Sequence, residues 1–124
     1  MRVIDSSAWI EFFTDGPNAE AYAPHIEASD VVTPSIVVYE VYRILRREAP
    51  EEQALRAVAH LQTTIVAELD VALALEAAEV GLEHGLAMAD AIVYATARSH
   101  EAELLTSDAD LAHLPGVTYF PKLP

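Results

Sequence analysis

Short runs of β-branched and aliphatic residues alternate along the chain with longer segments whose apolar positions recur at helical spacing. The short runs predict strands at residues 3–4, 30–33, 64–66 and 103–106, with a further short edge strand at 117–119. The longer segments predict helices at 6–13, 18–29, 34–48, 71–84 and 87–99, and another that opens at Pro50. This alternation is typical of an α/β fold, in which helices flank a central parallel sheet of four to five strands.

Local signals at the helix ends sharpen these boundaries. Thr33 is expected to cap the third helix, with Pro34 in its first position, where a missing N–H loses no hydrogen bond. Asp70 is expected to cap the fifth helix, and Gly85 is a natural stop because glycine readily adopts the left-handed conformation. Pro24 must either begin or kink the second helix.

The composition predicts one globular domain that spans residues 1–124. A chain of 124 residues, 52% of them hydrophobic, is long enough to bury one sizeable core. It has no cysteine, which excludes disulfides and thiolate metal sites. Its apolar runs are interrupted by Glu or Arg well before membrane-spanning length, and no signal-peptide pattern is visible. We therefore expect a cytoplasmic protein with no membrane partner.

The chain is strongly acidic, with 7 Lys and Arg against 20 Asp and Glu and a formal net charge of −13 at pH 7. Proteins that bind nucleic acid usually carry a basic surface, so tight non-specific binding is not expected. An enzyme that contacts phosphates through metal ions and a few arginines is compatible with this charge. The same surface suits a basic protein partner.

Four acidic residues interrupt otherwise apolar stretches: Asp5, Glu40, Asp90 and Asp108. Asp5 ends the first predicted strand and Asp108 follows the fourth, so both should lie at the carboxyl edge of the sheet, where open parallel sheets bind ligands. Glu40 lies about two turns into the third helix among apolar neighbours, and Asp90 lies in the first turn of a helix that is apolar almost all round. Buried carboxylates are unfavourable unless positive charge balances them. One metal-binding site at this edge could collect all four.

The chemistry of this acidic set favours Mg²⁺ or Mn²⁺, because both ions prefer carboxylate oxygens and retained water as ligands. Two such ions close together can activate water and stabilise both oxygens of an in-line phosphodiester displacement. The five histidines are scattered along the chain without ligand spacing, which argues against zinc.

Each acid also has a purely structural interpretation. Asp5 could cap the helix that follows it, and Asp90 could gain from the dipole of its helix. Glu40 could pair with an arginine on its own helix, and Asp108 could cap the turn after the fourth strand. These interpretations do not explain why the four acids converge on one edge of the sheet, so we favour the metal site.

The segments around the acids resemble those of a known family. Four of them are similar to the motifs of PIN-domain ribonucleases, in particular VapC toxins: Val3-Ile4-Asp5-Ser6-Ser7, Glu40 in its apolar helix, Ala89-Asp90-Ala91 leading to Ala95-Thr96-Ala97, and Leu105-Thr106-Ser107-Asp108. The resemblance covers essentially the whole chain. It implies an α/β/α sandwich and a Mg²⁺- or Mn²⁺-dependent endoribonuclease that cleaves RNA as the toxin of a toxin–antitoxin pair. It also implies a cognate VapB-type antitoxin and a homodimer.

Carried over residue by residue, the resemblance gives metal-binding and catalytic roles to Asp5, Glu40, Asp90 and Asp108. Ser6 and Thr106 match hydroxyl positions whose role would be to orient carboxylates. Asp110 is a further acid in the same turn and ranks below Asp108 as a metal ligand. At Ser107 the chain departs from the family pattern, because many relatives carry a basic or larger polar residue there.

Arg43 and Arg47 share the helix face of Glu40 and could hold RNA phosphates, or equally could pair with Glu40 and surface acids. Two other functions are conceivable for a domain of this kind. A PIN-like binding module without useful catalysis would have lost a metal acid, and none is lost here. A phosphorelay receiver would need a lysine after its last strand, whereas the only lysine is Lys122 near the C-terminal end, so this alternative is poor.

Overall fold

A computed structural model describes all residues, 1–124. Its centre is a five-stranded sheet in the order β3-β2-β1-β4-β5, in which every neighbouring pair is parallel. The strands are β1 (Arg2–Ile4), β2 (Val31–Pro34), β3 (Ile65–Ala67), β4 (Glu103–Thr106) and β5 (Val117–Tyr119). The predicted α/β fold with a parallel sheet is confirmed, and the expected edge strand is the fifth member of the sheet.

The strand order reverses direction once. The chain steps from β1 to β2 and β3 on one side, and then places β4 on the other side of β1. Open α/β sheets bind ligands at such a switch point, outside the carboxyl ends of the strands. Receiver domains place the third strand beside the first, whereas here β4 occupies that position, so the receiver alternative is wrong.

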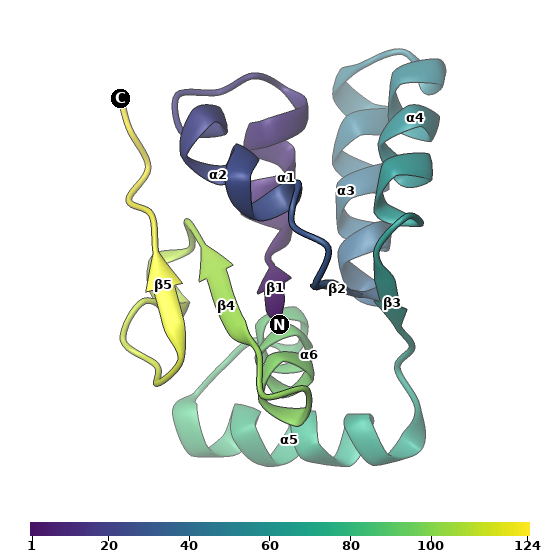
Figure 1. The fold of residues 1–124 in the computed structure, drawn as a ribbon. Helices are drawn as coiled ribbons and strands as arrows, with labels where there is room; N and C mark the ends of the chain where they lie inside the picture. The colour runs from purple at the N-terminus through teal and green to yellow at the C-terminus, as the bar shows by residue number, and fades with distance from the viewer.

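Helices flank the sheet in two groups (Figure 1). They are α1 (Ser6–Phe13), α2 (Ala19–Ile26), α3 (Ser35–Glu48), α4 (Glu51–Leu61), α5 (Val71–His84) and α6 (Met88–Ser99), and the 3₁₀ turn η1 (Ala109–Leu111) follows β4. In Figure 1 the pairs α1–α2 and α3–α4 lie above the strands and α5–α6 lies below them. The sheet is therefore the middle layer of an α/β/α sandwich, as the resemblance implies.

The core covers both faces of the central strands, with α1–α4 on one face and α6 on the other. Val3, Ile4 and Leu105 in β1 and β4 are fully buried, as expected for parallel strands covered on both faces. Helix α6 buries the seven consecutive residues 91–97, which confirms the prediction of a buried central helix. This packing fixes the first turn of α6 against the sheet.

Helix α3 begins one residue later than the sequence predicts, and Thr33 does not cap it. Pro34 is the last residue of β2 and occupies the N-cap position, so the helix begins at Ser35 without a side-chain cap. The Thr33 hydroxyl lies 2.6 Å from that of Thr64, which itself donates to the Leu61 carbonyl. Thr33 is fully buried, so its hydroxyl needs a partner within the protein, and Thr64, just before β3, supplies it.

The predicted ends of α5 are confirmed. The Asp70 carboxylate accepts a hydrogen bond from the Leu73 N–H (2.8 Å), and Gly85 ends the helix in the left-handed conformation with φ 67°. Pro24 lies inside α2, which ends two residues later at Ile26 and is shorter than predicted.

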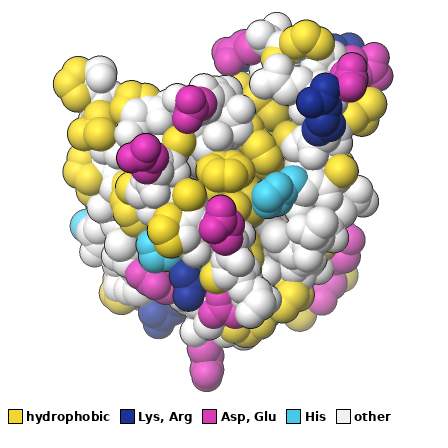
Figure 2. Space-filling view, turned by 45° about the horizontal axis from the view of Figure 1, so that its top comes forward, with side chains coloured by type: hydrophobic (Ala, Val, Ile, Leu, Met, Phe, Trp, Pro, Cys, Tyr) yellow, Lys and Arg dark blue, Asp and Glu magenta, His cyan; other side chains and the backbone are white.

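The surface combines an uncharged groove with a widely acidic exterior. The groove, of about 600 Å³, lies between α5 and α6 and has no charged residue in its lining. Leu82 of α5 lines this groove and is 83% exposed, and Leu75 on the same helix is exposed as well. Elsewhere acidic side chains outnumber basic ones, as on the face in Figure 2. No helix of the protein has the length and hydrophobicity needed to span a membrane.

Candidate metal centre

The switch point of the sheet brings Asp5 and Asp108 to the same edge. β1 and β4 are hydrogen-bonded neighbours, with Ile4 opposite Leu105. Asp5 directly follows β1, and its N–H donates to the Leu105 carbonyl (2.9 Å). Asp108 comes two residues after the end of β4. Both acids therefore follow the carboxyl ends of adjacent strands, where such sheets bind ligands.

Glu40 and Asp90 reach this edge from two helices. Helix α3 leaves the carboxyl end of β2, and Glu40 is its sixth residue. Helix α6 leads into the amino end of β4, so its first turn, which carries Asp90, lies at the carboxyl edge. After burial, the largest cause, the pKa of Asp90 is raised by the charges of four other acids: Asp108, Asp5, Glu40 and Asp110. The structure thus brings the four predicted acids together and adds Asp110.

The tightest group within this set is Asp90, Asp108 and Asp110. One carboxylate oxygen from each lies within 4.8 Å of the others. Asp90 and Asp108 are half-buried, and Asp110 is exposed. Asp110 is therefore as well placed as Asp108 to share an ion with Asp90, although the sequence ranked it lower. Asp5 and Glu40 lie outside this group, but their charges still act on it.

The acids have no positive partner. No ion pair joins any of the five to an Arg, Lys or His side chain. Burial and the neighbouring negative charges raise the pKa of Asp90 from 3.8 to about 7. Burial also raises the pKa of Asp5, against hydrogen bonds from Thr106 and Ser7, and that of Glu40, against one from the Ser6 side chain. Carboxyl groups perturbed in this way are typical of functional sites, and no basic side chain of the protein offsets their charge.

Asp5 is the most buried of the acids (4% exposed) and is held by two hydroxyl groups. Ser7 Oγ and Thr106 Oγ1 donate to Asp5 Oδ2, at 3.0 and 2.8 Å. Because each hydroxyl donates its proton to Asp5, its oxygen is free to accept a backbone N–H. The Ser107 N–H donates to Ser7 Oγ (3.1 Å), and the Asp108 N–H donates to Thr106 Oγ1 (2.9 Å). The network ties the turn after β4 to the acid after β1, and Asp5 Oδ1 has no hydroxyl donor.

Ser7 and Tyr22 belong to this network, although the sequence analysis did not predict them. The Tyr22 hydroxyl, on α2, is hydrogen-bonded to the Ser107 hydroxyl. Burial raises the pKa of Tyr22 to about 12, an effect that the Ser107 bond opposes and the charge of Asp5 reinforces, so the phenol stays protonated at neutral pH. The paired hydroxyls after β1 were a usable signal for Ser7. Tyr22 had none, because it lies 85 residues from its partner.

The structural interpretations account for only part of this arrangement. Asp108 does cap η1, because its Oδ1 accepts the Asp110 N–H (2.9 Å). Asp5 occupies the N-cap position of α1 but makes no side-chain cap bond. Asp90 lies at a helix N-terminus, yet its pKa is raised, so burial and like charges outweigh the helix dipole. Glu40 pairs with no arginine.

The two arginines considered for RNA contact are exposed on α3. Arg47 pairs with Glu48 (3.2 Å), and Arg43 forms no ion pair. Both guanidinium groups are therefore accessible, and neither neutralises the acid group.

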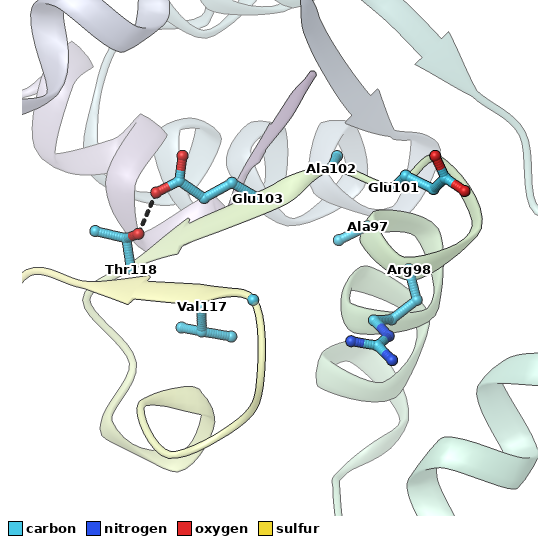
Figure 3. A pocket seen from close by; sticks show the side chains of 8 residues that line it. Ala97, Arg98, Glu101, Ala102, Glu103, Val117 and Thr118 are labelled. Carbon is cyan, nitrogen blue, oxygen red and sulfur yellow. Dashed lines mark hydrogen bonds between the residues drawn. The ribbon is translucent and has the colours of Figure 1, made fainter.

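A cavity of about 720 Å³, shown in Figure 3, has none of the five acids in its lining. It is lined by the C-terminal end of α6, including Arg98, and by the amino ends of β4 and β5, where the Thr118 hydroxyl donates to the Glu103 carboxylate. Because the acids follow the carboxyl ends of the strands, this cavity belongs to the opposite edge and is not the candidate centre.

The donor set fits a hard divalent cation. Its members offer carboxylate oxygens, and the surrounding side chains add hydroxyls rather than imidazole or sulfur. Oxygen ligands of this kind suit Mg²⁺ and Mn²⁺ better than zinc. Uncompensated negative charge and half-burial supply the electrostatic reason for a cation to bind there.

Comparison with known proteins identifies the family. The sequence-family model of the PIN domain matches residues 2–117, nearly the whole chain. The chain belongs to the PIN-domain family. No curated protein gives a significant match.

Solved structures agree with the PIN-domain assignment. A chain of a toxin–antitoxin complex from Klebsiella pneumoniae superposes with a TM-score of 0.85 at 24% identity, covering 99% of this chain and 100% of that one. VapC20 of Mycobacterium tuberculosis, described as a sarcin–ricin loop cleaving toxin, gives a TM-score of 0.81 at 20% identity, with 98% and 100% covered. A DNA-bound VapBC from Salmonella typhimurium gives 0.76 at 16%, with 98% of each chain covered. The fold that the resemblance implied is confirmed.

Replacing Asp90 by Asn should stabilise the metal-free PIN domain at neutral pH. The pKa of Asp90 is about 7 in the folded protein and 3.8 in the reference state, so the unfolded chain releases this proton at lower pH. The protonated Asp90 carboxyl therefore makes a contribution to the free energy of unfolding that is fully present below about pH 4 and is lost as the pH rises through about 7. Thermal unfolding with a chelator should show D90N melting several degrees above the parent at about pH 8 and no higher at about pH 4.

Asp70→Asn provides the matched control for this change. Asp70 caps α5 away from the acid group, and Asn is an equally good cap, so D70N should follow the parent at both pH values. Parallel melting curves for D90N and the parent over this pH range would show that Asp90 is not held protonated.

Proposed function

We propose that this PIN domain is a Mg²⁺- or Mn²⁺-dependent endoribonuclease that hydrolyses RNA as the toxin of a toxin–antitoxin pair. The observation that carries the proposal is a group of five uncompensated acids at the switch point, three of which bring oxygens within 4.8 Å of one another. Membership of the PIN family supports it. So does the fold shared with VapC20, which is described as a toxin that cleaves the sarcin–ricin loop.

In this proposal the metal ligands are the four predicted acids and, with them, the acid of the following turn: Asp5, Glu40, Asp90, Asp108 and Asp110. A bound Mg²⁺ or Mn²⁺ would supply the positive charge that activates water and stabilises the oxygens of the scissile phosphodiester.

The side chains around the acids prepare them for this task. The hydroxyls of Ser7 and Thr106 both donate to Asp5 Oδ2 and leave its Oδ1 without a hydroxyl donor. The Asp110 N–H fixes one oxygen of Asp108. The Asp90 carboxyl gives up its proton when positive charge arrives, because its raised pKa depends on burial and on neighbours that lack a counter-charge.

The net negative charge of the protein does not help it to hold RNA. The net charge of −13 repels a polyanion, so contact rests on metal ions and on local cations. We propose that Arg43 and Arg47 are those cations, since both are exposed on the helix that carries Glu40. Arginine suits this role because its planar fork can bind phosphate oxygens in pairs.

Substituting Asp5→Asn or Asp90→Asn should abolish metal-dependent RNA cleavage while the domain stays folded. Each change removes a carboxylate charge and keeps the side-chain size. We expect the rate to fall by roughly 100-fold or more, the upper end of the loss for removing even a supporting partner of a metal ligand. The measurement is cleavage of total cellular RNA with Mn²⁺ or Mg²⁺, with sites mapped for wild type and D5N.

The control for this assay is D70N, which should cleave like the parent. Undiminished cleavage by D5N or D90N would rule out the proposed centre. Absence of cleavage by the parent on transfer, ribosomal and messenger RNA would instead favour a PIN-like binding module.

Metal binding should release a proton and strengthen with pH. With a pKa of about 7 at Asp90, the fraction of this carboxyl that is ionised rises about tenfold between pH 6 and pH 8, and the apparent Mn²⁺ affinity should rise with it. Calorimetry in two buffers of different ionisation enthalpy measures the proton released per ion. In D90N, binding should be weaker, and its pH dependence should flatten. An affinity independent of pH in the parent would contradict the assignment of Asp90.

We further propose a VapB-type antitoxin as protein partner, because the Klebsiella and Salmonella proteins of the same fold are toxin–antitoxin assemblies. The acidic surface favours a partner with a basic segment. Co-expression with the product of an adjacent small open reading frame should give a stable complex in which RNA cleavage is suppressed. A neighbouring product that neither binds nor inhibits would count against this pairing.

A homodimer, which the family resemblance also implies, stays a prediction. Two copies of a chain with a net charge of −13 repel each other, so an uncharged contact surface is favoured. The groove between α5 and α6 is a surface of that kind.

A further inference from the structure

The turn that carries Asp108 and Asp110 is held in place by α2, a helix that contributes no acid to the metal centre. Tyr22, on α2, is fully buried, and its hydroxyl is hydrogen-bonded to that of Ser107, which is 5% exposed. Ser107 directly precedes Asp108. The contact therefore joins α2 to the first residue of the turn.

Ser107 is fixed on two sides at once. Its backbone N–H donates to Ser7 Oγ (3.1 Å), which donates in turn to Asp5 Oδ2. Its side chain is fixed separately by Tyr22. A shift of Ser107 would therefore disturb both the hydroxyl that orients Asp5 and the start of the segment that presents Asp108.

Tyr22 is itself held rigidly. Its ring packs on Phe120 with centroids 4.5 Å apart. One turn earlier on the chain, Asn18 Nδ2 donates to the Pro121 carbonyl (2.9 Å), which ties the start of α2 to the segment after β5. The phenol is thus a fixed point against which the turn can be positioned.

We propose that Tyr22 is a positioning residue for the metal centre, acting through Ser107 to set the turn of Asp108 and Asp110 against Asp5. This inference rests on the proposed function, since it assigns a partner to the same site. A larger residue in place of Ser107 would have to displace a fully buried tyrosine, whereas serine fits beneath its hydroxyl.

The test compares Mn²⁺ binding by Tyr22→Phe, Ser107→Ala, the double variant and Tyr94→Phe, using calorimetry of the chelator-treated protein. Y22F keeps the ring on Phe120 and loses only the hydroxyl, and S107A removes the same bond from the other side. Y94F is the matched control. Tyr94 lies on α6, the helix that carries Asp90, is 3% exposed, and donates its hydroxyl to the Pro115 carbonyl (2.9 Å). Melting temperatures show that each variant is folded.

Y22F and S107A should each bind Mn²⁺ roughly three- to tenfold more weakly, less than the loss for a direct partner of a ligand. The double variant should be no weaker than S107A, because both changes remove one shared bond. Y94F should bind like the parent. If the parent binds Mn²⁺ and Y22F and S107A match Y94F, the positioning role is overturned while the proposed function stands. If the parent binds no Mn²⁺, both fail. Should Y22F not fold, S107A against Y94F decides the question.

Discussion

The fold holds several carboxylates together without any positive charge among them, and this repulsion is the constraint on which the rest of the site depends. Parallel strands β1 and β4 deliver two acids to one edge, and the buried helix α6 delivers Asp90 to the same place. The acids cannot move apart, because the elements that carry them are set by the core. Burial and like charges raise the pKa of Asp5, Glu40 and, most clearly, Asp90. The core thus maintains an electrostatic strain that a cation would relieve.

Hydroxyl groups make this arrangement tolerable for the deepest acid. Asp5 is nearly inaccessible to water, and an ionised carboxylate there needs donors. Ser7 and Thr106 each donate a hydrogen bond to the same oxygen of Asp5, and each hydroxyl accepts a hydrogen bond from a backbone N–H. Every donor in this relay has an acceptor, so the network specifies one geometry for the turn after β4. Neutral donors satisfy the carboxylate without cancelling its charge, which an arginine would do.

The order and type of the elements could be predicted from the sequence because short β-branched and aliphatic runs alternate with segments of helical periodicity, and because α6 is apolar almost all round. The four acids could be predicted because a carboxylate in an apolar stretch is conspicuous. Thr33 was misjudged because its hydroxyl bonds to Thr64, a residue distant in the chain. The proximity of Asp110 to Asp90 could not be predicted, since it depends on how the turn closes. The contact of Tyr22 with Ser107 could not be predicted, because a contact across 85 residues leaves no local pattern in the sequence.

The sign of the surface charge gives the metal centre a second role under the proposed function. Without ions, the acid group adds to a field that already repels RNA phosphates. An ion in the centre would offset much of this negative charge and offer the scissile phosphate a positive ligand, while the rest of the surface stays acidic. Affinity is then concentrated at the reactive edge rather than spread along the RNA, because few cations elsewhere compete for phosphate. The same acidity that weakens non-specific binding leaves the surface open to a basic protein, so one charge distribution serves both restraint of the nuclease and recognition of its partner.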